Sequence, residues 1–158
     1  MDAAQQPTQE GIATDLAGLH EHVGSSVGSS DWAEMTQQQV DAFADVTGDH
    51  NFIHVDVERA RQTPFGGTIA HGFLTLSLLA PVTQRLDVTD AAVRINYGLD
   101  RVRFPAPLLV GARFRASATI EAVTAIDGGA QVKMAASVEV DGQSKPVCVA
   151  ECLLRFYA

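Results

Sequence analysis

Residues 72–86 read Gly-Phe-Leu-Thr-Leu-Ser-Leu-Leu-Ala-Pro-Val-Thr-Gln-Arg-Leu, and this stretch decides the fold. Its first nine residues carry no charge and are apolar on nearly every side of a helix. Such a helix is stable only where other elements surround it. The stretch therefore predicts a buried central helix. Pro81 should kink or locally break this helix near its middle, because proline supplies no backbone donor.

The chain after residue 90 is patterned for strands. Alternating or β-branched segments cover 93–99, 100–104, 112–125, 130–140 and 147–157. Asp127-Gly128-Gly129 and Asp141-Gly142 supply turns between the last three segments. Helices come first and an antiparallel meander second, an order typical of α+β proteins. We therefore expect a sheet that wraps around the central helix.

Residues 1–30 are predicted to form a polar leader in front of a domain over 31–158. Within the leader, a helical spacing joins Ile12, Leu16, Leu19 and Val23. We expect a short peripheral helix there, then a loop over 24–30 and a short strand over 32–35.

Helix signals continue beyond this strand. Thr36 with Gln39 three residues later is typical of a capping box, and Gly48 should end the helix that follows. Asp56 is placed to cap a second short helix over 57–62.

The composition of the 158 residues is that of one globular domain, with 46% hydrophobic and 19% charged residues. The net charge of -8 argues against a nucleic-acid partner, because phosphate binding needs a basic surface. No apolar run approaches the roughly 20 residues of a membrane helix. Residues 1–9 lack the pattern of a signal peptide. We expect a cytoplasmic protein without membrane contact.

The two cysteines, Cys148 and Cys152, fall in one predicted strand. At 3.3 Å per residue they would lie about 13 Å apart, which is too far for a disulfide. Both are expected to be buried thiols in a reducing compartment.

The segment Gly48-Asp49-His50-Asn51-Phe52-Ile53-His54-Val55-Asp56 gathers two carboxyl groups, two imidazoles and a carboxamide. Titratable groups on a loop between rigid elements are better placed for chemistry than for packing. A metal site built from His50, His54 and the two carboxylates is the weaker interpretation. Histidines four residues apart need a helix that Gly48 and Asn51 disfavour. The sequence also has no P-loop or other nucleotide motif, so we expect neither metal nor cofactor.

Four blocks in a fixed order, from about Trp32 to the C-terminus, resemble the MaoC-like (R)-specific enoyl-CoA hydratases. They are Gly48-Asp49-x-Asn51-x-x-His54-x-Asp56, Pro64-Phe65-Gly66, Ile69-Ala70-His71-Gly72 and Val102-x-Phe104-x-x-Pro107. The resemblance implies a hot-dog fold, in which an antiparallel sheet wraps one long helix, and a homodimer formed edge to edge. The family commonly has proline after the asparagine, where this chain has Phe52.

The resemblance also implies roles for single residues. Asp49 and His54 would hold and activate the water that adds to a 2-enoyl thioester. Asn51 would orient this pair or the substrate, and the Gly72 N–H would stabilise the thioester oxygen. Without the resemblance, each residue also allows a purely structural role. Asp49 and Asn51 could stabilise the turn, His54 could be a hydrogen-bonded, half-buried histidine, and Gly72 could allow tight packing. His71 is expected to support the loop.

The expected reaction is the reversible addition of water to trans-2-enoyl-CoA, giving (3R)-3-hydroxyacyl-CoA. Arg101 and Arg103 belong to five arginines between 94 and 115 that could hold the phosphates of CoA. The acyl tunnel is expected to be lined by Ser77, Leu78 and Ala80.

Two alternatives remain open at this point. One is a 3-hydroxyacyl dehydratase acting on acyl carrier protein, and the other is a non-catalytic acyl-CoA-binding subunit. The presence of both Asp49 and His54 favours an enzyme, because a binding subunit needs no base.

Overall fold

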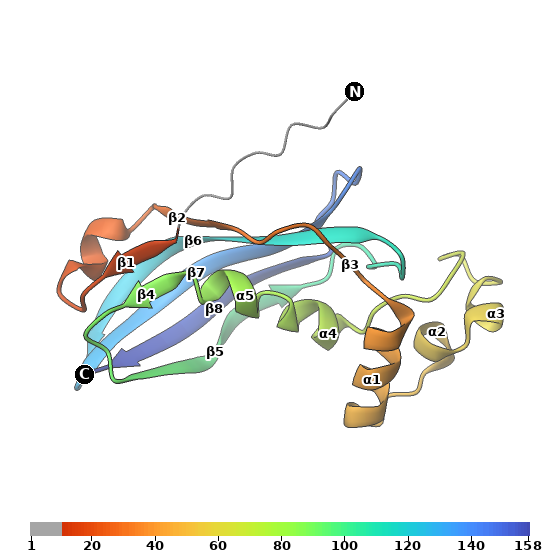
Figure 1. Ribbon diagram of the computed structural model, residues 1–158, viewed down its shortest axis with the longest axis horizontal. Coiled ribbons are helices and arrows are strands. Elements are labelled where there is room, and N and C mark those ends of the chain that lie inside the picture. The colour runs from red at the N-terminus through yellow and green to blue at the C-terminus, as the bar shows by residue number, and fades with distance from the viewer. Residues whose placement is uncertain (1–10) are drawn as a thin grey trace.

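The computed structural model of the protein describes residues 11–158 (Figure 1). One antiparallel sheet runs through it in the order β2-β6-β7-β8-β5, and β3 pairs with the start of β6. Its strands are β2 (Ser26–Ser29), β3 (Ala33–Glu34), β5 (Val93–Arg103), β6 (Arg113–Ile126), β7 (Gly129–Val140) and β8 (Cys148–Tyr157). Two short helices lie against one face of the sheet, so the chain is an α+β protein, as predicted.

The meander of β6, β7 and β8 follows the period-two pattern of the sequence. Gly128 and Gly142 have φ angles of 74° and 75° at the two turns, a region that glycine adopts without steric cost. Alternate residues of β7, such as Val132 and Met134, are fully buried and face the core. The three predicted strands and both turns are confirmed.

The edge strand β5 replaces the two strands predicted over 93–99 and 100–104. It pairs with β8 along its whole length, with register shifts between Asn96 and Gly98 and between Leu99 and Arg101. Such shifts bend a strand and raise its twist. Within residues 11–158, β5 has no strand partner on its other side.

The predicted central helix consists of two helices, α4 (Gly72–Ser77) and α5 (Ala80–Thr83). Between them, the N–H groups of Leu78 and Leu79 bond to carbonyls only three residues back. Pro81 follows in the first turn of α5, where its missing donor costs little. The break near Pro81 is confirmed, and a single continuous helix is wrong. Complete enclosure is also wrong, because the Phe73 side chain is 74% exposed.

The helix predicted over 12–23 is wrong as well. Ile12–Thr14 form β1, which pairs in parallel with β4 (Leu86–Val88), and a 3-10 helix, η1 (Gly18–His22), follows. The Asp15 carboxylate accepts the Gly18 N–H at 2.7 Å and starts that turn. The apolar spacing still marks burial, because Leu19 is fully buried.

The loop predicted over 24–30 is also wrong. Ser26–Ser29 form β2, which pairs with β6, and Val27 lies in the core. Residues 11–30 therefore contribute β2 to the main sheet, β1 to a separate two-stranded sheet with β4, and Leu19 and Val27 to the core. Residues 1–10 of the predicted leader lie outside the described part.

Three helices gather at one end of the sheet: α1 (Gln37–Thr47), α2 (Phe52–Val55) and α3 (Val57–Ala60) (Figure 1). The capping box of Thr36 and Gln39 is present, and Gly48 ends α1 with a φ of 78°. The Asp56 carboxylate accepts the Arg59 N–H at 3.0 Å and caps α3. These local predictions are confirmed, although α3 is shorter than the predicted 57–62.

Cys148 and Cys152 are free and buried, as predicted. Burial raises the pKa of the Cys148 thiol to about 11. Among the residues described, no helix is long and apolar enough to cross a membrane.

Candidate active site

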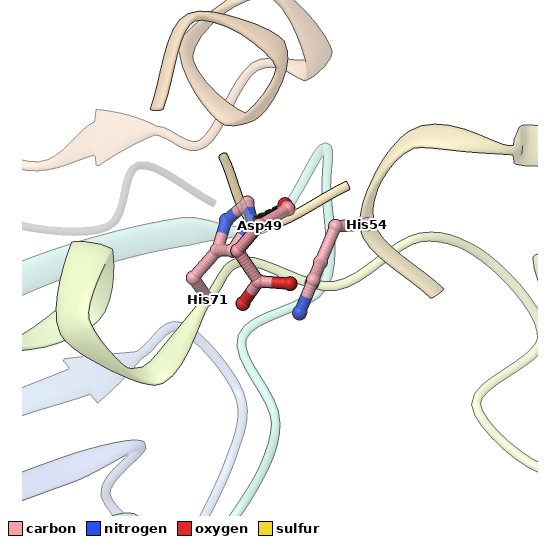
Figure 2. Close-up of side chains that lie close together, drawn as sticks. All are labelled: Asp49, His54 and His71. Atoms are coloured by element: carbon pink, nitrogen blue, oxygen red, sulfur yellow. Dashed lines mark hydrogen bonds between the residues drawn. The ribbon is translucent and has the colours of Figure 1, made fainter. Parts of the chain in front are cut away.

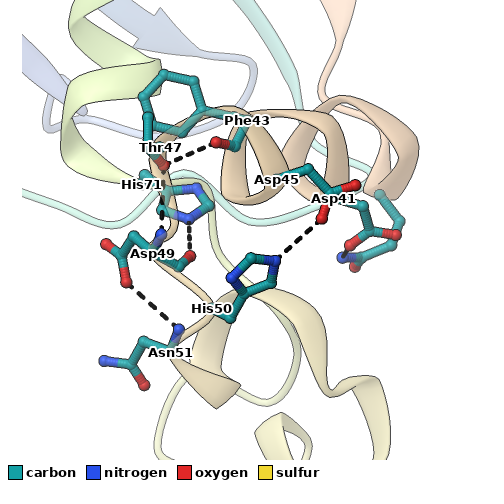
Figure 3. A network of polar contacts seen from close by, with 9 residues as sticks. Asp41, Phe43, Asp45, Thr47, Asp49, His50, Asn51 and His71 are labelled. Carbon is teal, nitrogen blue, oxygen red and sulfur yellow. Dashed lines mark hydrogen bonds and ion pairs between the residues drawn. The ribbon is translucent and has the colours of Figure 1, made fainter.

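Asp49 lies in the turn between α1 and α2, which begins at the left-handed Gly48. The main chain of this turn is held by short-range contacts (Figure 3). The Asn51 N–H donates to Asp49 Oδ1 at 3.3 Å, and Asn51 Oδ1 accepts the Ile53 N–H at 3.4 Å and caps α2. The structure thus gives Asn51 a turn role, and its predicted part in orienting substrate stays a prediction.

His54 is the third residue of α2, and its side chain is buried, with 7% exposure. Its Nδ1 lies 2.7 Å from the carbonyl oxygen of Ile69. A carbonyl only accepts, so Nδ1 carries the hydrogen and the neutral ring keeps a lone pair on Nε2.

The pKa of His54 is lowered from its usual value. Burial is the main cause, and the charge of neighbouring His71 acts in the same direction. The hydrogen bond to Ile69 and the charge of Asp49 oppose the shift. His54 is therefore neutral near pH 7 and able to accept a proton.

His71 is the N-cap residue of α4 and is only 3% exposed. Its Nε2 donates to the main-chain oxygen of Asp49 at 2.9 Å (Figure 3), which confirms the expected support of the loop. Its ring also stacks on that of His54, with centroids 3.8 Å apart, and lies 4.9 Å from the ring of Phe43. This stacking is absent from the sequence interpretation. The only sequence signal for it is the Ala70-His71-Gly72 block.

Asp49, His54 and His71 converge, as Figure 2 shows. Each offers one possible ligand atom, and these atoms all lie within 4.8 Å of one another. The predicted pair of Asp49 and His54 is thus brought together, with His71 as an unpredicted third member. Such a cluster can hold a cation, and it can equally hold a polarised water molecule.

The metal set considered from the sequence is not assembled. His50 points away from this cluster, and its Nε2 lies 3.0 Å from Asp45 Oδ1 (Figure 3). The hydrogen bond to Asp45 is the main reason why the pKa of His50 is raised. Asp56 is engaged in capping α3.

Gly72 opens α4 directly after His71. A Cβ atom at this position would lie 3.0 Å from Cε2 of Phe104, so the packing role suggested by the sequence is real. The first bond within this helical turn runs from the Thr75 N–H to the His71 oxygen, which leaves the N–H groups of residues 72–74 without helical partners. Packing and hydrogen-bond donation are therefore compatible at Gly72.

The five arginines do not form one site. Arg113 pairs with Asp141, Arg115 with Glu139, and Arg94 donates to a threonine. Arg101 and Arg103 pair in register with Glu151 and Val149 of β8, and Arg103 donates to a neighbouring carbonyl. Binding of CoA phosphates by Arg101 and Arg103 stays a prediction.

Comparison with known proteins identifies the family of the chain. The family described as MaoC like domain matches residues 19–143. A 3-hydroxyacyl-thioester dehydratase Z of Mycobacterium tuberculosis is 48% identical over 145 residues, covering 90% of this chain and 96% of that protein. A 3-hydroxybutyryl-CoA dehydratase of Methylorubrum extorquens is 31% identical over 126 residues, covering 68% and 78%.

Among solved structures, the unliganded R-hydratase PhaJ1 of Pseudomonas aeruginosa is similar, with a TM-score of 0.70 and 24% identity. The match covers 85% of this chain and 81% of that one, and it confirms the predicted hot-dog fold. The chain therefore belongs to the MaoC-like family of hot-dog hydratases and dehydratases.

Proposed function

We propose that the protein is an (R)-specific enoyl-CoA hydratase. It adds water reversibly to trans-2-enoyl-CoA and forms (3R)-3-hydroxyacyl-CoA. The observation that carries this proposal is the convergence of the Asp49 carboxylate with a buried, neutral His54 whose Nε2 lone pair is free. Two proton acceptors so close together can hold one water molecule between them.

In this reaction the water oxygen bonds to C3 and its proton passes to the pair of Asp49 and His54. The pair returns a proton to C2, so that its protonation state is unchanged after one turnover. The proton balance closes without an electron acceptor or a cofactor.

Negative charge develops on the thioester oxygen while C3 is attacked. The N–H of Gly72 is the proposed donor to this oxygen, since it has no helical partner and follows the residue that stacks on His54. The missing side chain lets the thioester approach the main chain closely.

The acyl chain is proposed to lie along α4 and α5. A groove of about 420 Å³ runs there, between these helices and the strands β5 and β8. Of the three residues expected to line the acyl tunnel, Ser77 and Ala80 line this groove and Leu78 does not.

A homodimer would close the open side of this groove. Phe73 on α4 is exposed there, and the free edge strand β5 exposes Val93, Ile95 and Tyr97. An unpaired edge with apolar side chains favours pairing with a second copy.

The proposed compartment is the cytoplasm. Two free, buried thiols are compatible with its reducing conditions.

The second candidate function is the reverse reaction, dehydration of a 3-hydroxyacyl group that is bound to acyl carrier protein instead of CoA. The similarity to a 3-hydroxyacyl-thioester dehydratase supports both candidates, because a thioester is common to CoA and carrier substrates. The net charge of -8 does not separate the two candidates, because the phosphates of CoA and an acidic carrier are both anionic.

The test is loss of enoyl-thioester absorbance with crotonyl-CoA, in the wild type and in Asp49→Asn. We expect the variant to be slower by about 10²–10⁴-fold, the usual effect of losing a general acid or base. Asp45→Asn makes the same chemical change on the neighbouring helix and should keep full activity. Chiral analysis should show the (3R) alcohol. No turnover with crotonyl-CoA or longer enoyl-CoAs would refute the CoA hydratase and bring the carrier-protein reaction forward.

A further inference from the structure

The groove along α4 and α5 differs in polarity between its two ends. The end nearest Gly72 is apolar and is lined by Phe73, Leu76 and Leu99. The other end is lined by Thr83, Gln84, Arg94 and Asn96. Thr83 follows Gly72 by eleven residues, which corresponds to roughly 16 Å at the α-helical rise of 1.5 Å per residue. The polar end is thus where the far end of an acyl chain would lie.

Arg94 and Asn96 line the groove from the edge strand, and both side chains are exposed to solvent in the single chain. In the register of β5 and β8, Arg94 is opposite Phe156 and Asn96 is opposite Leu154, and both of these partners are buried in the core. Both polar side chains are therefore accessible to a ligand that enters the groove.

Within the described part of the chain, the guanidinium group of Arg94 has no counter-ion. Its Nη2 donates to Thr83 Oγ1 at 3.0 Å, and it forms no ion pair with any residue from 11 to 158. By contrast, Arg113 and Arg115 both pair with carboxylates. Protein atoms displace part of the water around Arg94, which lowers its pKa without discharging it.

We propose that this end of the groove binds a carboxylate at the far end of the acyl chain. The preferred substrate would then be a 2-enoyl thioester whose acyl group ends in a carboxylate rather than a methyl group. Arg94 supplies the charge, and the buried hydroxyl of Thr83 holds its guanidinium in place. A planar guanidinium with free N–H donors suits a carboxylate, which can accept two of them side by side. The inference rests on the proposed hydratase function and deepens it.

The test compares pairs of 2-enoyl-CoA substrates of equal chain length, one ending in a methyl group and one in a carboxylate. For the wild type we expect kcat/KM to favour the carboxylate substrate by at least tenfold at the best chain length. Arg94→Met keeps the length of the side chain and removes its charge. It should lower the carboxylate-to-methyl ratio by about tenfold to a hundredfold, the usual worth of a hydrogen bond to a charged group. Thr83→Val should lower the ratio less.

Arg61→Met is the matched control, because Arg61 is exposed and pairs with Glu58 on α3, outside the groove. It should leave the ratio unchanged. The dimer is checked for every variant by light scattering. A wild type that prefers the methyl substrate at every length would overturn the proposal. So would an Arg94→Met variant that loses both substrates equally or loses the dimer, since Arg94 would then serve the interface.

Equilibrium binding separates this proposal from the proposed function. Saturated acyl-CoA pairs with methyl or carboxylate ends are titrated into the wild type and Arg94→Met. If no enoyl-CoA is hydrated, the hydratase is refuted, but tighter binding of the carboxylate ligand by the wild type alone would still support the site. Equal affinities for both ligands would exclude it.

Discussion

The rings of His54 and His71 are stacked, with centroids 3.8 Å apart and planes inclined by 25°. Two imidazolium ions at this distance would repel each other. The stack therefore joins burial in keeping His54 neutral, while each ring donates one hydrogen to a main-chain oxygen, of Ile69 and of Asp49. One pair of rings thus affects both the protonation of His54, the proposed base, and the position of Asp49.

The first prediction concerns the pH dependence of the reaction. Burial lowers the pKa of His54, so the neutral base persists below the usual histidine value of about 6.5. As the pH falls, kcat/KM should stay constant through 6.5 and decline only below it. Initial rates between about pH 5 and 8 measure this, because kcat/KM reports the free enzyme. A midpoint at or above 6.5 would contradict the effect of burial.

The second prediction concerns His71. His71→Phe keeps a ring against His54 but removes the donor to the Asp49 oxygen. We expect a loss of about 1–3 kcal/mol in the free energy of unfolding and about tenfold in kcat. The acidic midpoint of kcat/KM should move up, because one source of positive charge beside His54 is gone.

His71→Gln restores a donor and should recover part of kcat. His50→Phe serves as the control in the same loop, since the His50 ring is exposed and contacts Asp45. If His71→Phe lowered stability but left both kcat and the midpoint unchanged, His71 would be a purely structural residue.

The third prediction separates the two roles of Gly72. Gly72→Ala should destabilise the fold by about 1–3 kcal/mol through overpacking against Phe104. It should also lower kcat/KM at least tenfold, because the methyl group would lie where the thioester approaches in the proposed reaction. In the double variant Gly72→Ala/Phe104→Leu, thermal unfolding should return towards the wild type while the rate stays low. Full recovery of the rate would leave packing as the only role of Gly72.

The fourth prediction tests the dimer. Ile95 lies on the free edge strand and is 42% exposed. Ile95→Lys places a charge on that edge, a substitution that blocks pairing of sheets. Light scattering should show twice the chain mass for the wild type and a single chain for the variant, with reduced activity. Val46→Lys is the control, because Val46 on α1 is 85% exposed and far from β5 in sequence. A wild-type monomer would refute the dimer outright.

The predictions that hold rest on signals between residues close in sequence. The side chains of Thr36 and Gln39 satisfy each other's main-chain donors, and Gly48 adopts a conformation that few other residues accept. Such features are readable because the partners are at most four residues apart. The same holds for the turns at Gly128 and Gly142.

The predictions that fail depend on partners distant in sequence. Ile12 fits a helical spacing, yet its main chain bonds beside Leu86, and no local signal announces that pairing. The stacking of His71 on His54 likewise needs α4 and α2 to meet, which only the folded chain decides. The convergence of Asp49 and His54 is predictable from the sequence because the two are only five residues apart.

The pairing of β1 with β4 also has a consequence for the order of assembly. The meander β6–β7–β8 closes through tight turns, and such local pairings form fast. In contrast, Ile12 pairs with Leu86, and all the α-helices lie between them in the sequence. The sequence separation between β2 and β6 is larger still, so closing either contact costs more chain entropy. Residues 11–29 are therefore expected to dock last onto a sheet already formed. The strands synthesised first would therefore be the last to fold. In hydrogen-exchange experiments during refolding, the main-chain N–H groups of β1 and β2 should become protected later than those of β7.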